Sequence, residues 1–107
     1  MDLGIDLVQI SEFRRRMGKG SLDKVFLPVE LSQNSRVESL CGVFAAKEAF
    51  FKALGRKDDW LDVCVEKKSD GKPYIFSPLL PISQKAHLSI SHTGDYAVAI
   101  VLIETLA

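Results

Sequence analysis

Residues 36–54 carry the longest periodic hydrophobic pattern in the chain, and this pattern predicts one long helix. Ser35 and Glu38 have the spacing of a capping box at its beginning. Gly55 follows the last apolar residue, at the position where helices commonly end. A helix of this length must bury its apolar side chains against a second layer, so the rest of the chain has to supply that layer.

The hydrophobic period changes from 3.6 to 2 after this helix, which predicts strands. Asp70-Gly71 and Thr93-Gly94-Asp95 are turn signals that would join neighbouring strands into hairpins. The expected strands cover residues 3–10, 62–66, 73–76, 88–91 and 96–103, and short helices are expected at 11–17 and 29–33. The sequence therefore predicts an α+β fold, with an antiparallel sheet packed on one long helix plus short helices.

The bulk properties of the chain narrow its class. Its 107 residues predict a single domain over residues 1–107. The 14 Lys and Arg residues balance 14 Asp and Glu residues, so no overall charge favours a nucleic acid or a membrane as partner. No apolar run has the length of a membrane span, and the N-terminus lacks the pattern of a signal peptide. Cys41 and Cys64 have no metal-ligand spacing, which predicts buried thiols in a cytoplasmic protein.

Glu48 is a carboxylate among the apolar residues of the long helix. In projection it lies within about 40° of Phe44 and on the same stripe as Phe51. A carboxylate that leaves water there needs a compensating partner. Lys52, one helical turn along, is one such partner, and a divalent cation is the other. Considered alone, the pattern is typical of an ordinary helical ion pair.

Three further sites along the chain need an interpretation. Asp6 interrupts an apolar strand and is either exposed to solvent or a ligand. His92 and Thr93 precede a tight turn, where they form either an anion site or a solvated cap. Lys72 and Pro73 belong to a hairpin turn and need no function of their own.

Two groups of side chains are candidates for contacts with other molecules. Arg14, Arg15 and Arg16 span about 200° of a helix, so they cannot all face one partner. Phe50 lies on the back of the long helix, away from its main apolar stripe, which suggests a second buried contact such as a subunit interface.

Four segments, in order, carry a resemblance to a known family: G-I-D, F-A-A-K-E-A-F-F-K-A-L, G-K-P-Y and L-S-I-S-H-T-G-D-Y-A-V-A. From about Gly4 to Val101 the chain resembles the holo-acyl-carrier-protein synthases, the small bacterial class of 4′-phosphopantetheinyl transferases. The resemblance implies the fold of that family and an enzyme that binds coenzyme A and Mg²⁺. A serine hydroxyl of an apo-acyl carrier protein attacks the β-phosphate, the phosphopantetheine arm moves to the serine, and 3′,5′-ADP leaves.

The resemblance also assigns roles to residues of this chain. Asp6 and Glu48 match the metal ligands, and Lys52 matches a lysine near the pyrophosphate. These three are the expected catalytic residues, and Glu48 is the candidate that accepts the serine proton, directly or through a water. The expected coenzyme-binding residues are Lys52, Lys72, Pro73, Ser91, His92 and Thr93.

Partners follow from the same resemblance: an acyl carrier protein, mostly in fatty-acid biosynthesis, and a homotrimer with active sites between its subunits. The chain departs from the family pattern at Glu12, where an arginine usually docks the carrier. Val43 replaces a residue that is often basic or aromatic, and the glycine-rich stretch after the helix is shortened to residues 55–60. The expected carrier-docking residues are therefore Arg14, Arg15 and Arg16.

Two alternatives to the enzyme remain open from the sequence. One is a non-catalytic module of the same fold that binds coenzyme A or a carrier protein, which Glu12 and the short loop favour. The other is a structural protein in which Glu48 and Lys52 form only an ion pair, which leaves the other motifs unexplained.

Overall fold

The computed structural model describes residues 1–20 and 22–107. Its elements, in chain order, are β1 (Asp2–Gln9), α1 (Ile10–Met17), α2 (Pro28–Gln33), α3 (Val37–Leu54), β2 (Cys64–Lys67), β3 (Pro73–Phe76), β4 (Gln84–Thr93) and β5 (Tyr96–Thr105), with short 3₁₀ turns at Leu22–Lys24 and Trp60–Asp62. The predicted α+β class and the long helix are confirmed. None of the helices in these two ranges is long and apolar enough to cross a membrane.

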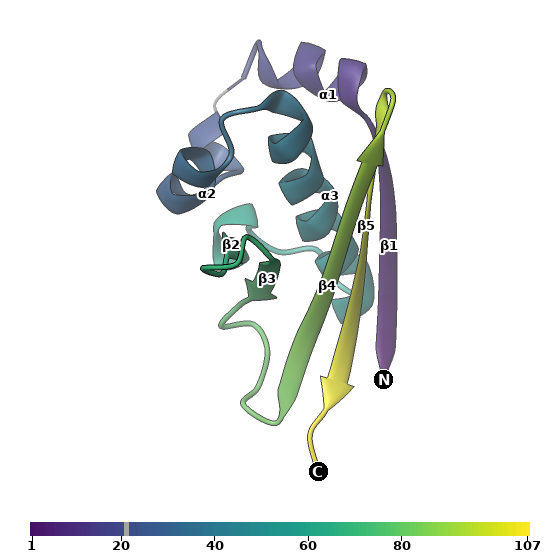
Figure 1. The fold of residues 1–107 in the computed structure, drawn as a ribbon. Helices are drawn as coiled ribbons and strands as arrows, with labels where there is room; N and C mark the ends of the chain where they lie inside the picture. Colours follow the sequence, from purple (N-terminus) through teal and green to yellow (C-terminus); the bar gives the residue numbers. More distant parts are fainter. Residues whose placement is uncertain (21) are drawn as a thin grey trace.

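The strands form two antiparallel sheets around α3 (Figure 1). One sheet has the order β1-β5-β4, and the other is the β2-β3 hairpin. The three-stranded sheet packs on one side of α3, α2 and the hairpin lie on the other side, and α1 crosses the end at which α3 begins (Figure 1). The long helix is therefore enclosed between two layers, which places residues from almost every element beside it.

Small residues bring α3 and the sheet close together. Ala49 and Ala53 of the helix are buried against β1, and a Cβ atom at Gly4 would lie 2.0 Å from the Ala49 carbonyl oxygen and 2.6 Å from the Ala53 nitrogen. No side chain fits there, so Gly4 is what allows β1 to lie directly on the helix. Asp6, two residues along the same strand, is held on the same inner face.

The second buried contact predicted for Phe50 is confirmed, but it lies within the chain and not at a subunit interface. Its side chain is fully buried within the chain and packs edge-to-face on Phe51, with ring centroids 6.0 Å apart. It is therefore not available to a subunit interface. The apolar back of the helix is therefore covered by other parts of the same chain.

The structure also corrects the predicted helix caps. Arg36 precedes α3 and makes no side-chain cap, while the Glu38 carboxylate lies 3.6 Å from the Arg36 guanidinium instead of bonding the backbone. The capping box predicted at Ser35 is thus wrong.

Lys47 and Glu30 form a fully buried ion pair, with Lys47 Nζ 2.6 Å from Glu30 Oε1. Lys47 also donates to the carbonyl oxygens of Val25 and Trp60, and Glu30 accepts from the backbone N–H groups of Leu27 and Val65. Every polar atom of the pair is therefore compensated, although burial lowers the pKa of Lys47. The pair ties α2, α3 and β2 together.

The two cysteines are buried and free, as predicted. Burial raises the pKa of both Cys41 and Cys64 to about 11, so neither is a thiolate near neutral pH. Phe13 and Trp60 belong to the aromatic core around Phe44.

Candidate functional site

Asp6 faces α3 rather than solvent. The strand alternation places its neighbours Ile5 and Leu7 on the opposite, exposed face of β1. Lys52 Nζ lies 3.0 Å from Asp6 Oδ1 and donates a second hydrogen bond, also of 3.0 Å, to the carbonyl oxygen of Ile5. The exposed interpretation of Asp6 is wrong, and the strand carries a carboxylate that is paired across to the helix.

Glu48 lies one turn before Lys52 on α3, but the two do not form the predicted ion pair among the interactions of the described residues. Lys52 is instead held by Asp6 and the β1 backbone, because that strand packs directly on the helix. The nearest cation to Glu48 is Lys57, with Nζ 3.8 Å from Oε1. The Glu48 side chain is 24% exposed, so its carboxylate reaches the surface of a cavity instead of the core.

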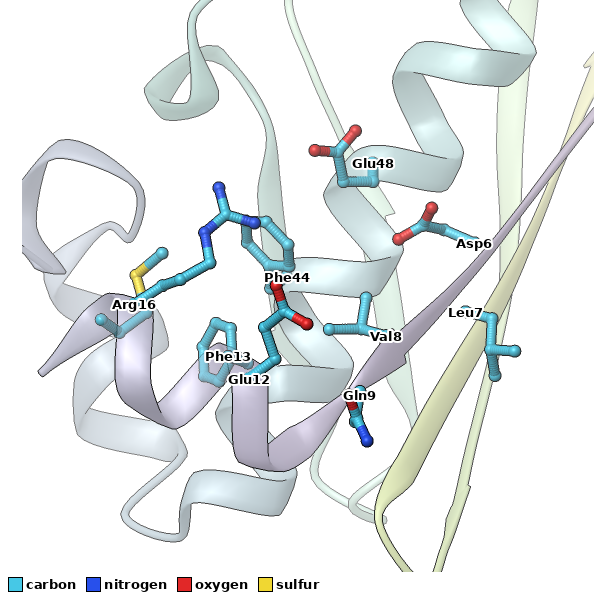
Figure 2. A pocket seen from close by; sticks show the side chains of 10 residues that line it. Asp6, Leu7, Val8, Gln9, Glu12, Phe13, Arg16, Phe44 and Glu48 are labelled. Atoms are coloured by element: carbon cyan, nitrogen blue, oxygen red, sulfur yellow. The ribbon is translucent and has the colours of Figure 1, made fainter.

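Asp6 and Glu48 line the same cavity, which has a volume of about 320 Å³ (Figure 2). Its walls come from β1, α1 and α3, and two charged side chains of α1, Glu12 and Arg16, also line it. Figure 2 shows the charged ends of Arg16, Asp6 and Glu48 directed toward this shared space, above the rings of Phe13 and Phe44. The cavity thus combines carboxylates, a guanidinium and an apolar wall.

The carboxylates of this cavity fit a hard divalent cation. Within residues 1–20 and 22–107, no group of three or more His, Cys, Asp or Glu residues is arranged to hold a metal ion. Asp6 and Glu48 therefore offer oxygen ligands from two residues, which suits Mg²⁺ because it usually keeps several positions for water and phosphate oxygens.

The other predicted binding residues lie elsewhere. His92 and Pro73 line a second cavity, of about 130 Å³, beside the first half of α3. Lys72 and Thr93 are exposed, and Ser91 lies on the opposite face of β4 from His92. A single chain therefore does not bring His92 into the cavity of Asp6 and Glu48.

The predicted docking arginines also separate. Arg16 lines the cavity of Asp6, Arg14 lines a groove between α1 and the beginning of α3, and Arg15 lies 3.7 Å from Glu12. Sequence reasoning did not place Arg16 or Glu12 beside the carboxylates. Their spacing of four residues puts both on one face of α1, which was the available signal.

The turn after His92 is bonded to α1. Asp95 accepts hydrogen bonds from the Ser11 N–H (2.9 Å) and the Ser11 hydroxyl (2.6 Å), and its carbonyl oxygen accepts from the Ile10 N–H (2.7 Å). These bonds from Ser11 hold the pKa of Asp95 below its usual range. Asp95 therefore connects the β4-β5 turn to the first turn of α1.

Comparisons with known proteins agree with this architecture. A sequence model of the 4′-phosphopantetheinyl transferase superfamily matches residues 2–101. The holo-[acyl-carrier-protein] synthase of Bacillus subtilis is 37% identical over 121 residues, which cover 98% of this chain and 96% of the relative. A holo-(acyl-carrier-protein) synthase from Bacillus anthracis, solved in complex with CoA (3′,5′-ADP), superposes with a TM-score of 0.85 at 29% identity and covers 97% of this chain and 96% of its own. The Helicobacter pylori enzyme in complex with coenzyme A gives a TM-score of 0.83 at 26% identity, with 95% and 99% covered.

The chain therefore belongs to the 4′-phosphopantetheinyl transferase superfamily. Within it, the matched relatives are holo-[acyl-carrier-protein] synthases over nearly their whole length, and the prediction of an enzyme of this kind is confirmed.

Proposed function

We propose that this chain transfers the 4′-phosphopantetheine arm of coenzyme A to a serine of an apo-acyl carrier protein and releases 3′,5′-ADP. The observation that carries the proposal is the position of Asp6, which is paired with Lys52 and lines one cavity with Glu48 where β1 packs on α3. Phosphoryl transfer needs positive charge beside the non-bridging phosphate oxygens and the departing phosphate. Lys52 supplies one positive charge, and a divalent cation held by the carboxylates of Asp6 and Glu48 would supply the rest.

Asp6 and Glu48 would hold Mg²⁺, which when bound supplies charge neutralisation for the phosphate oxygens. Lys52 holds a positive charge beside them, through its ammonium group 3.0 Å from Asp6. Its flexible stem allows that ammonium group to contact the departing phosphate. Lys52 and the two carboxylates are therefore assigned to binding and orienting the pyrophosphate.

The serine Oγ attacks the phosphorus that carries the pantetheine arm and forms the new P–O bond. The bond from this phosphorus to the bridging oxygen breaks, and its electron pair leaves with 3′,5′-ADP. Glu48 accepts the serine proton, directly or through a water. Its carboxylate faces the cavity, whereas the carboxylate of Asp6 is already paired with Lys52.

A homotrimer with active sites between subunits is part of the proposal. Two features of the described residues support assembly. His92 and Pro73 lie in a different cavity from Asp6, so a neighbouring chain would have to complete each site. The outer face of the three-stranded sheet also carries a continuous apolar surface, formed by Leu3, Ile5, Leu7, Val98, Ile100 and Leu102.

The β1 side of this surface is exposed in the single chain. Leu3, Ile5 and Leu7 are 64%, 58% and 65% exposed, and each lies opposite one aliphatic residue of β5 in the register of the sheet.

We further propose that residues 1–107 act as one transferase domain in the cytoplasm. Arg14 and Arg15, on the exposed side of α1, are the proposed contacts to an acidic carrier surface.

Intact mass spectrometry tests the reaction. An apo-acyl carrier protein incubated with the chain, coenzyme A and Mg²⁺ should gain one phosphopantetheine, and EDTA should prevent the gain. Asp6→Asn and Glu48→Gln should each lower the rate at least about 100-fold, whereas Asp23→Asn, an exposed carboxylate away from the cavity, should not change it. Absence of transfer to several apo-carriers, with folded protein, would favour the non-catalytic module. Full turnover by Glu48→Gln would remove Glu48 as the proton acceptor.

A further inference from the structure

The three consecutive arginines of α1 have different surroundings. Arg15 lies 3.7 Å from Glu12 and is exposed, and Arg14 lines the groove against the beginning of α3. Only Arg16 lines the cavity that also contains Asp6 and Glu48 (Figure 2). Equal charges on adjacent residues therefore face separate parts of the molecule.

The Arg16 guanidinium is available to a ligand. In the part of the chain that the structure describes, Glu12 is within ion-pair distance of Arg15, and no carboxylate is within that distance of Arg16. Figure 2 shows its side chain extended toward Phe44 and Glu48, at the edge of the cavity. A guanidinium has a planar fork of N–H donors that matches two oxygens of one phosphate.

We propose that Arg16 binds the phosphate that carries the pantetheine arm of coenzyme A, an inference that rests on the proposed function. A ligand that lies between Arg16 and the two carboxylates must accept hydrogen bonds from the Arg16 guanidinium. On its other side it must share with Asp6 and Glu48 the cation that these two residues would hold. A phosphate does both, because its non-bridging oxygens point in several directions.

An acidic side chain of a carrier protein fits this position less well. Three carboxylates, those of Asp6, Glu12 and Glu48, line the same cavity as Arg16. Another carboxylate without a metal would face repulsion from all three, whereas a phosphate that arrives with Mg²⁺ brings its own compensating charge. Arg16, which lines this cavity, is thus assigned to the coenzyme, and Arg14 and Arg15, which do not, to the carrier.

Binding of coenzyme A without carrier protein tests this assignment. The full chain with Mg²⁺, at a salt concentration of about 0.15 M to limit long-range electrostatics, would be titrated calorimetrically with coenzyme A and with 3′,5′-ADP. Arg16→Gln should raise the Kd of coenzyme A about tenfold or more, because a charged phosphate contact is lost. Arg16→Lys, which keeps the charge but loses the fork, should give a smaller increase.

The matched control is Arg15→Gln, which removes the same charge from the next residue and should change the Kd less than about twofold. The Kd of 3′,5′-ADP, which lacks the phosphate of the pantetheine arm, should change little in Arg16→Gln. Equal effects of Arg15→Gln and Arg16→Gln would overturn the inference. An equal loss of affinity for coenzyme A and for 3′,5′-ADP in Arg16→Gln would also overturn it. So would an unchanged Kd of coenzyme A together with a raised KM for the carrier protein. Failure of the unsubstituted chain to bind coenzyme A would instead contradict the proposed function itself.

Discussion

Gly4 shows how one residue determines the position of a functional side chain. A Cβ atom at this position would meet the α3 backbone at 2.0 Å, so any other residue must push β1 away from the helix. The hydrogen bonds of Lys52 to Asp6 and to the Ile5 carbonyl oxygen span the same contact. The glycine of the G-I-D segment is therefore required for the aspartate to reach α3.

Gly4→Ala should destabilise the chain by about 1–3 kcal/mol or more, because the added methyl group has no space. The rate of phosphopantetheine transfer should fall as well, since Asp6 moves with β1. Gly20→Ala is the matched control: its Cβ would lie 3.7 Å from the nearest heavy atom, an ordinary contact. Urea unfolding measures the stability, and an effect of Gly4→Ala no larger than that of Gly20→Ala would contradict this account.

At the scale of elements, Asp95 joins two segments that are 84 residues apart in the chain. The β4-β5 turn contains Asp95 and follows His92, while Ser11 belongs to α1, which carries Arg16. The backbone and side-chain bonds between them limit the angle at which α1 leaves β1. The turn therefore helps to orient the helix that forms one wall of the cavity.

This contact predicts a pH dependence of stability. The pKa of Asp95 is lower in the folded chain than in the unfolded chain, so the ionised carboxylate stabilises the fold. That contribution is complete well above the unfolded pKa of about 3.9 and is lost as the pH falls through the folded pKa. The difference in unfolding free energy between the unsubstituted chain and Asp95→Asn should be constant from about pH 5 to 7 and shrink at lower pH.

Denaturant unfolding at a series of pH values measures this difference. Ser11→Ala removes the hydroxyl donor to Asp95. It should likewise reduce the part of the unfolding free energy that depends on pH. A difference that stays constant or grows as the pH approaches 3 would show that Asp95 is not held by this contact in solution.

At the scale of the whole molecule, the predicted binding residues fall into two separate groups. Asp6, Glu48 and Arg16 line one cavity, and His92 with Pro73 lines another. The apolar outer face of the three-stranded sheet is exposed in the single chain. Assembly through this face would bury apolar surface and, in the proposed trimer, would bring the two groups from neighbouring chains together.

Mixed assemblies test this arrangement. Asp6→Asn and His92→Ala chains should each be nearly inactive alone, and mixing them should restore about a quarter of the unsubstituted activity, the share of interfaces that join two intact halves after random exchange. Adding Ile100→Glu to both chains should abolish the recovery, because a charge then lies in the apolar face. If the chains are shown to have exchanged and no activity returns, Asp6 and His92 would belong to a site within a single chain.

Local pattern in the sequence was sufficient for the helix at 36–54, the hairpins, the α+β class, and the choice of Asp6, Glu48 and Lys52 as site candidates. These depend on periodicity, on turn residues and on motifs in order, all of which are properties of neighbouring residues. Even so, the only side-chain partner that the sequence offered for Glu48, beside a divalent cation, was Lys52, because a helix pattern contains only the i,i+3 and i,i+4 neighbours of a residue.

Tertiary structure alone decided which charges meet. Because β1 lies close to α3, Lys52 is paired with Asp6, and because α2 packs on α3, Lys47 is paired with Glu30. The packing around α3 also buries Phe50. The direction of each arginine on α1 likewise depends on how that helix packs, not on its composition. The sequence by itself determined the elements, the family and most of the reactive groups. Their partners were decided by packing between distant segments, because burial and ion pairing depend on three-dimensional neighbours that no local pattern records.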